Sequence, residues 1–227
     1  MTLIFDEYGP QLLRAFLTTI SLFFPSAILA VVLGAGLAAM RVSSIGILRR
    51  VSGAYVEIVR NTPLTLILLL CSLGLAQTLG VTFVDPNSST SIADSAFRLS
   101  VLGLGAYTAT AVCEVLRSGI NSVSVGQAEA ARALGLTFNQ LLWVVVMPQA
   151  IRYVIAPMGS VFVALIKNTT LAAIIGVAEA ALLMREMVEN LADVLVIGGI
   201  FAVGFLLLTI PTGLAFGWAA RRWAVIS

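Results

Sequence analysis

Long stretches without a charged residue dominate the chain and set its organisation. Five of them stand out, at residues 15–40, 61–84, 99–113, 153–166 and 194–220. A helix needs about 20 apolar residues to cross a bilayer. The first, second and fifth stretches are long enough, and the third and fourth reach that length if a charged residue is drawn in at one end. The pattern predicts an all-α membrane protein with five transmembrane helices and one domain over residues 1–227.

The composition agrees with this interpretation. Hydrophobic residues make up 59% of the chain and charged residues only 11%, with a mean hydropathy of +1.04. A soluble domain carries roughly 25% charged residues. The acidic start of the chain, with Asp6 and Glu7, is unlike the basic start of a signal peptide. We therefore expect the first apolar stretch to remain in the mature protein.

The missing residue types exclude several kinds of chemistry. There is no histidine, which removes histidine zinc sites and Ser/His/Asp triads. Lysine occurs once, at Lys167, where no GxxxxGK[ST] phosphate-binding loop surrounds it. Cys71 and Cys113 lie in apolar stretches and favour core packing over redox or metal roles. If this protein uses ATP, another chain must bind it.

The placement of arginine predicts the orientation. With five spans, one side carries nine arginines and the other side three, whereas eight acidic residues fall on the second side and three on the first. Cytoplasmic loops are the ones enriched in arginine and lysine. The sequence therefore predicts an N-terminus outside and a C-terminus inside. The nine arginines expected inside are Arg41, Arg49, Arg50, Arg60, Arg117, Arg132, Arg152, Arg221 and Arg222.

The largest inward loop, residues 118–150, contains two helix-start signals. Ser124 with Gln127 and Thr137 with Gln140 both have the form of a capping box. The first predicts a helix from about Val125 to Leu134, ended by Gly135. The second predicts a helix that enters the apolar residues before Pro148. A short alanine-rich helix of this kind suits a groove on a cytoplasmic partner, and an ordinary interhelical loop is the alternative.

The sequence of this inward loop resembles that of a known protein family. The segment from Gly126 to Leu136, followed by the Pro-Gln of residues 148–149, is similar to the EAA loop of bacterial ABC-importer permeases of the polar amino-acid family. The resemblance covers nearly the whole chain and is strongest to permease subunits of glutamate-uptake systems. It implies the type I ABC-importer permease fold, with the loop helix acting as a coupling helix that sits in a cleft of the ATPase subunit. The residues implied in coupling are Gly126, Gln127, Ala128, Glu129, Ala130, Ala131, Arg132, Leu134 and Gly135.

A polar patch around Lys167 is the candidate solute pathway. A lone lysine in an apolar stretch is costly and seldom faces lipid. Four polar residues in a row can interrupt a helix, and transporters place substrate sites at such breaks. A structural ion pair with Glu179 or Glu114 is the alternative role for the lysine. The candidate pathway residues are Lys167, Asn168, Thr169 and Thr170, with Arg60, Asn61 and Thr62 before a kink expected at Pro63.

The residue after the lysine bears on the solute. Permeases that resemble this one commonly have Lys-Asp-Thr-Ser where this chain has Lys167, Asn168, Thr169 and Thr170. Replacing the aspartate removes a negative charge beside the ammonium group. An unopposed cation favours an anionic or zwitterionic solute over a cationic one, so we expect glutamate or a related amino acid.

The resemblance implies a non-catalytic permease subunit that binds no cofactor, with ATP and Mg on the partner ATPase. The expected partners are a second permease of a different sequence, a dimer of ATPase subunits and an external solute-binding protein. That protein would dock on the loop from Asp85 to Arg98 and the acidic segment from Glu179 to Asp193. The alternative function is an ATP-independent secondary transporter or channel, which five spans without a detectable inverted repeat disfavour.

Overall fold

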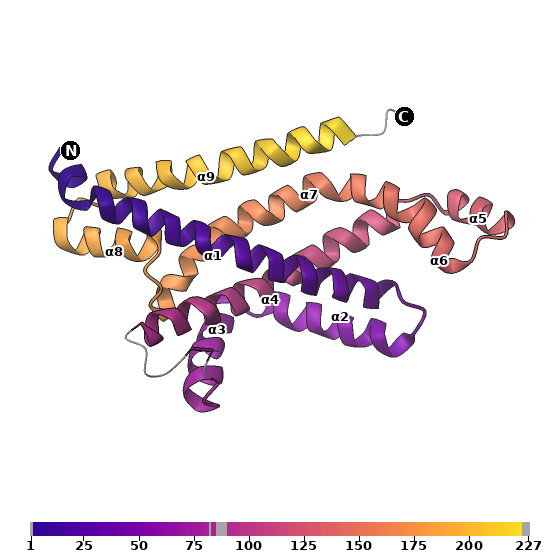
Figure 1. Cartoon of the computed structure of the whole chain (residues 1–227), viewed down its shortest axis with the longest axis horizontal. Helices are drawn as coiled ribbons and strands as arrows, with labels where there is room; N and C mark the ends of the chain where they lie inside the picture. Colours follow the sequence, from indigo (N-terminus) through magenta and orange to yellow (C-terminus); the bar gives the residue numbers. More distant parts are fainter. Residues whose placement is uncertain (1, 82, 85–89, 224–227) are drawn as a thin grey trace.

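Four long helices lie lengthwise beside one another and make up the body of the protein (Figure 1). They are α1 (Thr2–Val42), α4 (Ser91–Asn121), α7 (Met147–Asn168) and α9 (Val194–Trp223). The structure, a computed structural model, describes residues 2–81, 83–84 and 90–223, and within these every regular element is helical. The predicted fold class is confirmed at the level of an all-helical membrane protein.

Shorter helical segments connect the long helices. On the N-terminal side of α4 they are α2 (Gly46–Asn61), α3 (Leu64–Leu69) and the π-helical η1 (Leu70–Thr78). Between α4 and α9 they are α5 (Val125–Ala133), α6 (Phe138–Gln140), the π-helical η2 (Leu141–Val146), the 3-10 segment η3 (Thr169–Ile175) and α8 (Ala180–Leu191).

The most extensive helix contact joins α1 to α4, and glycines allow the close approach. A Cβ atom on Gly34 would lie 2.6 Å from the Cβ of Val112, and one on Gly105 would lie 2.6 Å from Leu29 Cδ2. Both distances are shorter than real Cβ contacts allow. Small residues at helix contacts are the usual means of close packing within a membrane.

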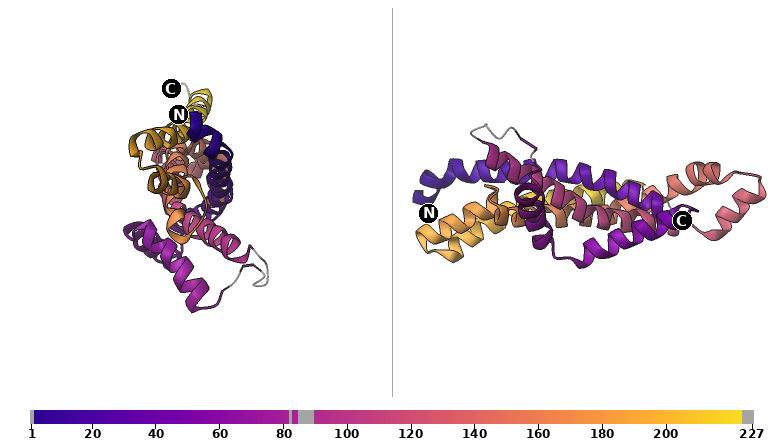
Figure 2. Two further views of the ribbon diagram at one scale, coloured as in Figure 1. Left: turned by 90° about the vertical axis from the view of Figure 1, so that its left-hand side faces the viewer. Right: turned by 90° about the horizontal axis from the view of Figure 1, so that it is seen from below.

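The second predicted span has a shorter helix than expected and follows a sharp bend. The chain bends by 103° between α2 and the segment formed by α3 and η1, and this pair is apolar and long enough to cross a membrane only if both parts are counted together. Segments α3 and η1 have six and nine residues, about 22 Å of helix, which is short of the roughly 30 Å needed. Figure 2 shows α3 leaving the bundle sideways.

The other four expected spans coincide with helices that are longer than predicted. Helices long and apolar enough to cross a membrane cover Glu7–Val42, Ser91–Asn121, Leu141–Ile175 and Val194–Trp223. The third of these was expected to begin at Tyr153. It begins earlier because Pro148 lies in the first turn of α7 and the π-helical turn of η2 leads into it without a break.

The two ends of the bundle carry different elements. The N-terminal end of α1 and helix α8 lie together at one end of the bundle, which we call the α8 end (Figures 1 and 2). Helices α5 and α6 project from the opposite end, which we call the α5 end. The C-terminal end of α9 points toward the α5 end. Of the loop expected from Asp85 to Arg98, residues 85–89 lie outside the described residues, and the part from Ser91 onward is wrong as a loop because it forms the first turns of α4.

Candidate functional site

Helix α5 begins where the sequence predicted, but its first turn closes differently. Ser124 is the N-cap residue, yet its side chain accepts no hydrogen bond. The N–H of Gln127, which the serine hydroxyl should have bound, donates instead to the Ser124 carbonyl at 3.1 Å. A backbone hydrogen bond therefore forms at this position in place of the predicted capping box.

The end of α5 is a Schellman motif. The N–H of Gly135 donates to the Arg132 carbonyl at 2.9 Å, and the N–H of Leu136 donates to the Ala131 carbonyl at 3.2 Å. Gly135 has a φ of +81°, which side-chain-bearing residues rarely adopt. Leu136 also packs in the apolar cluster that contains Ala131. The predicted helix stop at Gly135 is confirmed.

The second capping box forms as predicted. The Thr137 hydroxyl accepts from the Gln140 N–H at 3.4 Å, and the Gln140 side chain accepts from the Thr137 N–H at 2.9 Å. The helix it starts then runs through η2 into α7. The Schellman motif ends α5 and the capping box begins α6 directly after it, so the turn between the two helices has a defined shape.

The candidate coupling residues divide between two environments. Ala131 is buried against Leu141 and Val146 of the same chain. A partner therefore cannot contact Ala131 directly. Most of the other candidates have exposed side chains, with Ala128 half-buried. The surface left for a partner consists of Gly126, Gln127, Glu129, Ala130, Arg132, Leu134 and Gly135.

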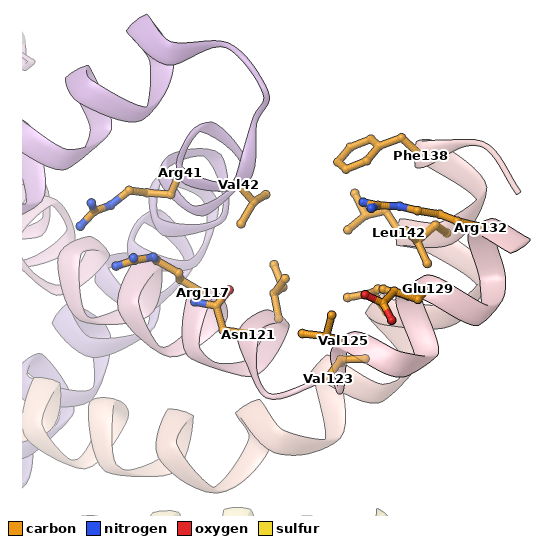
Figure 3. Close-up of a pocket in the computed structure, with 14 residues that line it drawn as sticks. Arg41, Val42, Arg117, Asn121, Val123, Val125, Glu129, Arg132, Phe138 and Leu142 are labelled. Carbon is orange, nitrogen blue, oxygen red and sulfur yellow. The ribbon is translucent and has the colours of Figure 1, made fainter.

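A cleft of about 510 Å³ separates α5 from the ends of α1 and α4. Figure 3 shows Arg41 and Arg117 on one side of it, with their guanidinium groups turned away from the cleft, and Glu129, Arg132 and Phe138 on the other side. Sequence reasoning counted these arginines for orientation but did not group them, because they come from three separate helices.

An ion-pair network joins α1 to α4 beside this cleft. Arg41 donates to Glu114 with a distance of 2.8 Å from Nη2 to Oε1, and Arg117 lies 3.6 Å from the other carboxylate oxygen. Glu114 and Arg117 lie three residues apart on α4, a spacing at which side chains meet on one helix face, and Arg41 adds a contact from α1. Glu57 and Arg60 have the same spacing on α2 but form no salt bridge among the described residues.

The polar residues at the start of the predicted second span lie at its bend. Helix α2 ends at Asn61, and Thr62 adopts an extended backbone with its hydroxyl donating to the Ile58 carbonyl at 2.8 Å. Pro63 then precedes α3 without a side-chain cap. The predicted kink at Pro63 is confirmed as a complete break of the helix.

The Lys167 patch also lies at a change of helix type. Helix α7 ends at Asn168, and the 3-10 segment η3 begins at Thr169. Lys167 is exposed on the single chain, whereas Thr169 is buried and its hydroxyl donates to the Ile166 carbonyl at 2.7 Å. Among the described residues Lys167 forms no salt bridge, and Glu114 and Glu179 have other partners.

Packing brings the two polar breaks toward each other. Segments α3 and η3 are in contact. Leu64 and Leu68 of α3 belong to a cluster against which Leu171 and Ile175 of η3 also pack. The bend after Arg60, Asn61 and Thr62 is thus adjacent to the segment that follows Lys167, as one pathway would require.

Sequence reasoning missed the structural role of Glu179. Its side chain is fully buried and accepts from the N–H groups of Ala181 and Leu182 at 2.9 and 3.1 Å, capping α8. The Thr19 hydroxyl of α1 lies 3.5 Å from the other carboxylate oxygen. Burial raises the pKa of this carboxyl, and the hydrogen bonds partly oppose the shift. An acid directly before the apolar start of α8 was the available signal.

Comparison with known proteins gives a consistent result. A family model described as "binding-protein-dependent transport system inner membrane component" matches residues 30–225. Two glutamate transport system permease proteins, from Corynebacterium efficiens and Corynebacterium glutamicum, are 53% and 52% identical to this chain, with 99% of each sequence covered. A probable glutamine ABC transporter permease of Bacillus subtilis is 34% identical over 84% of this chain and 83% of its own length.

Solved structures agree on the fold. The crystal structure of an amino acid ABC transporter with histidines superposes with a TM-score of 0.85 at 27% identity and covers 97% of both chains. An inward-facing methionine ABC transporter superposes with a TM-score of 0.72 at 17% identity and covers 94% of this chain and 96% of that one, a similarity of fold alone.

Proposed function

The chain belongs to the family of inner membrane components of binding-protein-dependent transport systems, and from that premise we propose that it carries glutamate in an ATP-driven importer. It is a multi-pass protein of the cytoplasmic membrane and a permease subunit. The observation that carries the choice of solute is the 53% identity, over 99% of both sequences, to a glutamate permease.

The chemistry of the polar patch supports an anionic solute. Lys167 is exposed on the single chain and forms no salt bridge within the described residues. An ammonium group in an apolar span is stabilised when it faces an aqueous cavity or an opposite charge. We assign the solute pathway to Lys167, Asn168, Thr169 and Thr170, together with Arg60, Asn61 and Thr62 at the adjacent bend.

We propose five spans, with the bent pair of α2 and α3–η1 counted as the second. The N-terminus is then outside and the C-terminus inside. The α5 end carries Arg41, Arg117 and Arg132 with the last turn of α9, which contains Arg221 and Arg222. The positive-inside rule supports assigning this end to the cytoplasm.

In this orientation α5 is the coupling helix. Its exposed small residues Gly126 and Ala130 let a partner surface approach closely, and the Schellman motif at its C-terminal end fixes how the chain leaves it. The partner is an ATPase subunit that binds ATP and Mg, because this chain contains no phosphate-binding loop. A second permease of different sequence and two ATPase subunits complete the membrane complex.

The α8 end receives the external solute-binding protein. The exposed side chains of Glu186, Glu189 and Asp193 make the surface around α8 acidic, whereas Glu179 is buried and does not contribute to it. A negative outer face weakly repels a free anionic solute, so delivery by a closed carrier protein overcomes this barrier.

The experiment is a competition panel with the complete purified complex in proteoliposomes. Uptake of radiolabelled glutamate should fall when unlabelled glutamate is added with the binding protein, fall less with aspartate or glutamine, and remain unchanged with arginine. Equal competition by arginine would contradict the assignment of an acidic solute.

A further inference from the structure

Helix α2 lies lengthwise along α1 and α4 (Figure 1) and has three different faces. Residues three or four positions apart share one side of a helix. The face on the bundle is fixed by Ser52 and Tyr55, whose hydroxyls donate to carbonyls of α1 and α4 at 2.8 and 3.0 Å. The second face is exposed and apolar, with Ile47, Val51, Ala54 and Ile58. The third, which we call the polar face of α2, consists of Arg49, Arg50, Gly53, Glu57 and Arg60.

The polar face of α2 reaches the level of the middle of the long helices. Leu64, directly after the bend, belongs to one cluster with Ala27 of α1 and Leu104 of α4. Ala27 is at the centre of the charge-free stretch of α1, and Leu104 is near the middle of α4. At about 1.5 Å per residue, Glu57 and Arg60 are at most about 11 and 6 Å from this level. Both distances are within the roughly 15 Å half-thickness of the hydrocarbon region.

Glu57 and Arg60 have no ion partner in the part of the chain that the structure describes. Both side chains are exposed, and neither takes part in a salt bridge there. An ionised side chain at this depth is costly against lipid, and it faces water or an opposite charge. Glu57 and Arg60 therefore face either water or another subunit in the complete complex.

Polar groups continue from Glu57 in both directions along α2. Toward the α5 end, a Cβ atom on Gly53 would lie 3.3 Å from Nη1 of Arg41, which is paired with Glu114. In the other direction, Arg60 leads to the bend before α3, and α3 packs beside η3. A single charge on a partner subunit would compensate one of these groups and leave the others in apolar surroundings. A water-filled route along the polar face of α2 accommodates all of them.

We propose that Glu57 faces this aqueous route and is a specificity-determining residue for the solute. Its carboxylate is three residues before Arg60 on the same face, so its negative field opposes the attraction of Arg60 and Lys167 for carboxylates. Glutamate has a net negative charge and glutamine has none. Glu57 therefore limits the preference for glutamate over glutamine. The role in specificity rests on the proposed function, whereas the contact of Glu57 with water does not depend on which solute is carried.

The first test measures whether position 57 meets water in the complete complex. Complexes with Glu57→Cys or Ile58→Cys are placed in nanodiscs and treated with a positively charged, membrane-impermeant thiosulfonate, both without nucleotide and with ATP and Mg. Nanodiscs leave both sides of the membrane open, so the result does not depend on the orientation of the chain. Glu57→Cys should react at least about tenfold faster than Ile58→Cys in one of the two states.

Ile58 is the matched control, because it is the next residue, is 66% exposed on the single chain and belongs to the apolar face. The unmodified chain gives the background, since Cys71 and Cys113 are buried. Equal rates at the two positions, or no reaction at either, would overturn the proposal. Position 57 would then be covered by lipid or by another subunit.

The second test measures the role of the charge in specificity. Glu57→Gln keeps the shape of the side chain and should raise the ratio of glutamate uptake to glutamine uptake about threefold, with the same binding protein throughout. Glu57→Asp keeps the charge and should keep the ratio. An unchanged or lower ratio in Glu57→Gln would overturn the role in specificity. If the unmodified complex did not transport glutamate, the proposed function would fail, and the thiol reaction would still support or contradict the contact of Glu57 with water.

Discussion

Arg41 and Glu114 form a 2.8 Å ion pair that joins the end of α1 to α4. The side chains are only 22% and 31% exposed, and Arg117 adds a weaker second contact to the same carboxylate. A pair with this degree of burial leaves a costly unpaired charge when one partner is removed. The α5 end of the bundle is therefore fixed partly by electrostatics.

We predict that Glu114→Gln destabilises the folded complex by about 1–3 kcal/mol, between the ranges for exposed and buried pairs. Thermal unfolding of the purified complex measures this as a lower Tm. Glu57→Gln is the matched control, because Glu57 is exposed and forms no salt bridge within the described part of the chain. An equal loss of stability in both variants would mean that the network contributes nothing specific.

The Schellman motif after α5 gives a second prediction. Gly135→Val forces a left-handed backbone on a β-branched residue at a cost of about 1–2 kcal/mol. ATP-driven uptake should fall about fivefold or more as α5 loses its exit turn. Gly135→Asn should retain most activity, because asparagine tolerates this conformation. Since a Cβ at Gly135 meets nothing within 4 Å, equal defects in both variants would point to a clash with a partner rather than to backbone strain.

The buried Glu179 carboxyl predicts a dependence of stability on pH. Its pKa is raised above the ordinary value of 4.5 because burial disfavours the charged form. Its contribution to the free energy of unfolding is complete below about pH 4.5 and is lost as the pH rises through the raised pKa. The complex should therefore lose stability as the pH rises above about 4.5 and through the raised pKa.

Glu179→Gln should flatten this pH dependence, since the amide oxygen can still accept from Ala181 and Leu182. Thermal unfolding at several pH values measures the slope. Glu186→Gln, at an exposed position of the same helix, should keep the original slope. An unchanged slope in Glu179→Gln would show that this carboxyl does not titrate in the folded protein.

Selectivity at Lys167 gives a further prediction. Lys167→Ala should lower glutamate uptake more than it lowers assembly of the complex. Asn168→Asp places a carboxylate beside the ammonium group, an interaction of about 1–4 kcal/mol for charges about 4 Å apart. It should reduce glutamate uptake more than glutamine uptake.

Lys167→Arg keeps the positive charge and should retain part of the glutamate uptake, which makes it the control for Lys167→Ala. Radiolabelled uptake of both solutes and co-purification of the partner subunits are measured together. If the variants lose both solutes in parallel with loss of assembly, Lys167 has a structural role and the pathway lies elsewhere.

The sequence predicted features that depend on short-range hydrogen bonds. Gly135 and the pair of Thr137 with Gln140 determine the shape of the α5 loop through contacts within a few residues. A kink at Pro63 was also predicted, but the complete break with its 103° bend was not, because the angle depends on the packing of α3 against η3.

Long-range burial could not be predicted from the same patterns. Ala131 and Ala130 are neighbours in an alanine-rich helix, yet only Ala131 packs against Leu141 and Val146. Likewise, Glu179 resembles the exposed acids that follow it, and its burial depends on Thr19 of a helix 160 residues away in sequence. Such differences arise when separate helices meet, which hydrophobic periodicity does not describe.

The measurement that tests the central claim most directly compares glutamate uptake by two sets of proteoliposomes. One contains this chain, the second permease and the ATPase, and the other lacks the ATPase; both are supplied with loaded binding protein outside and ATP with Mg inside. We predict concentrative uptake in the first set and none above background in the second. Equal uptake without the ATPase would contradict an ATP-driven importer and show that the permease transports glutamate without ATP.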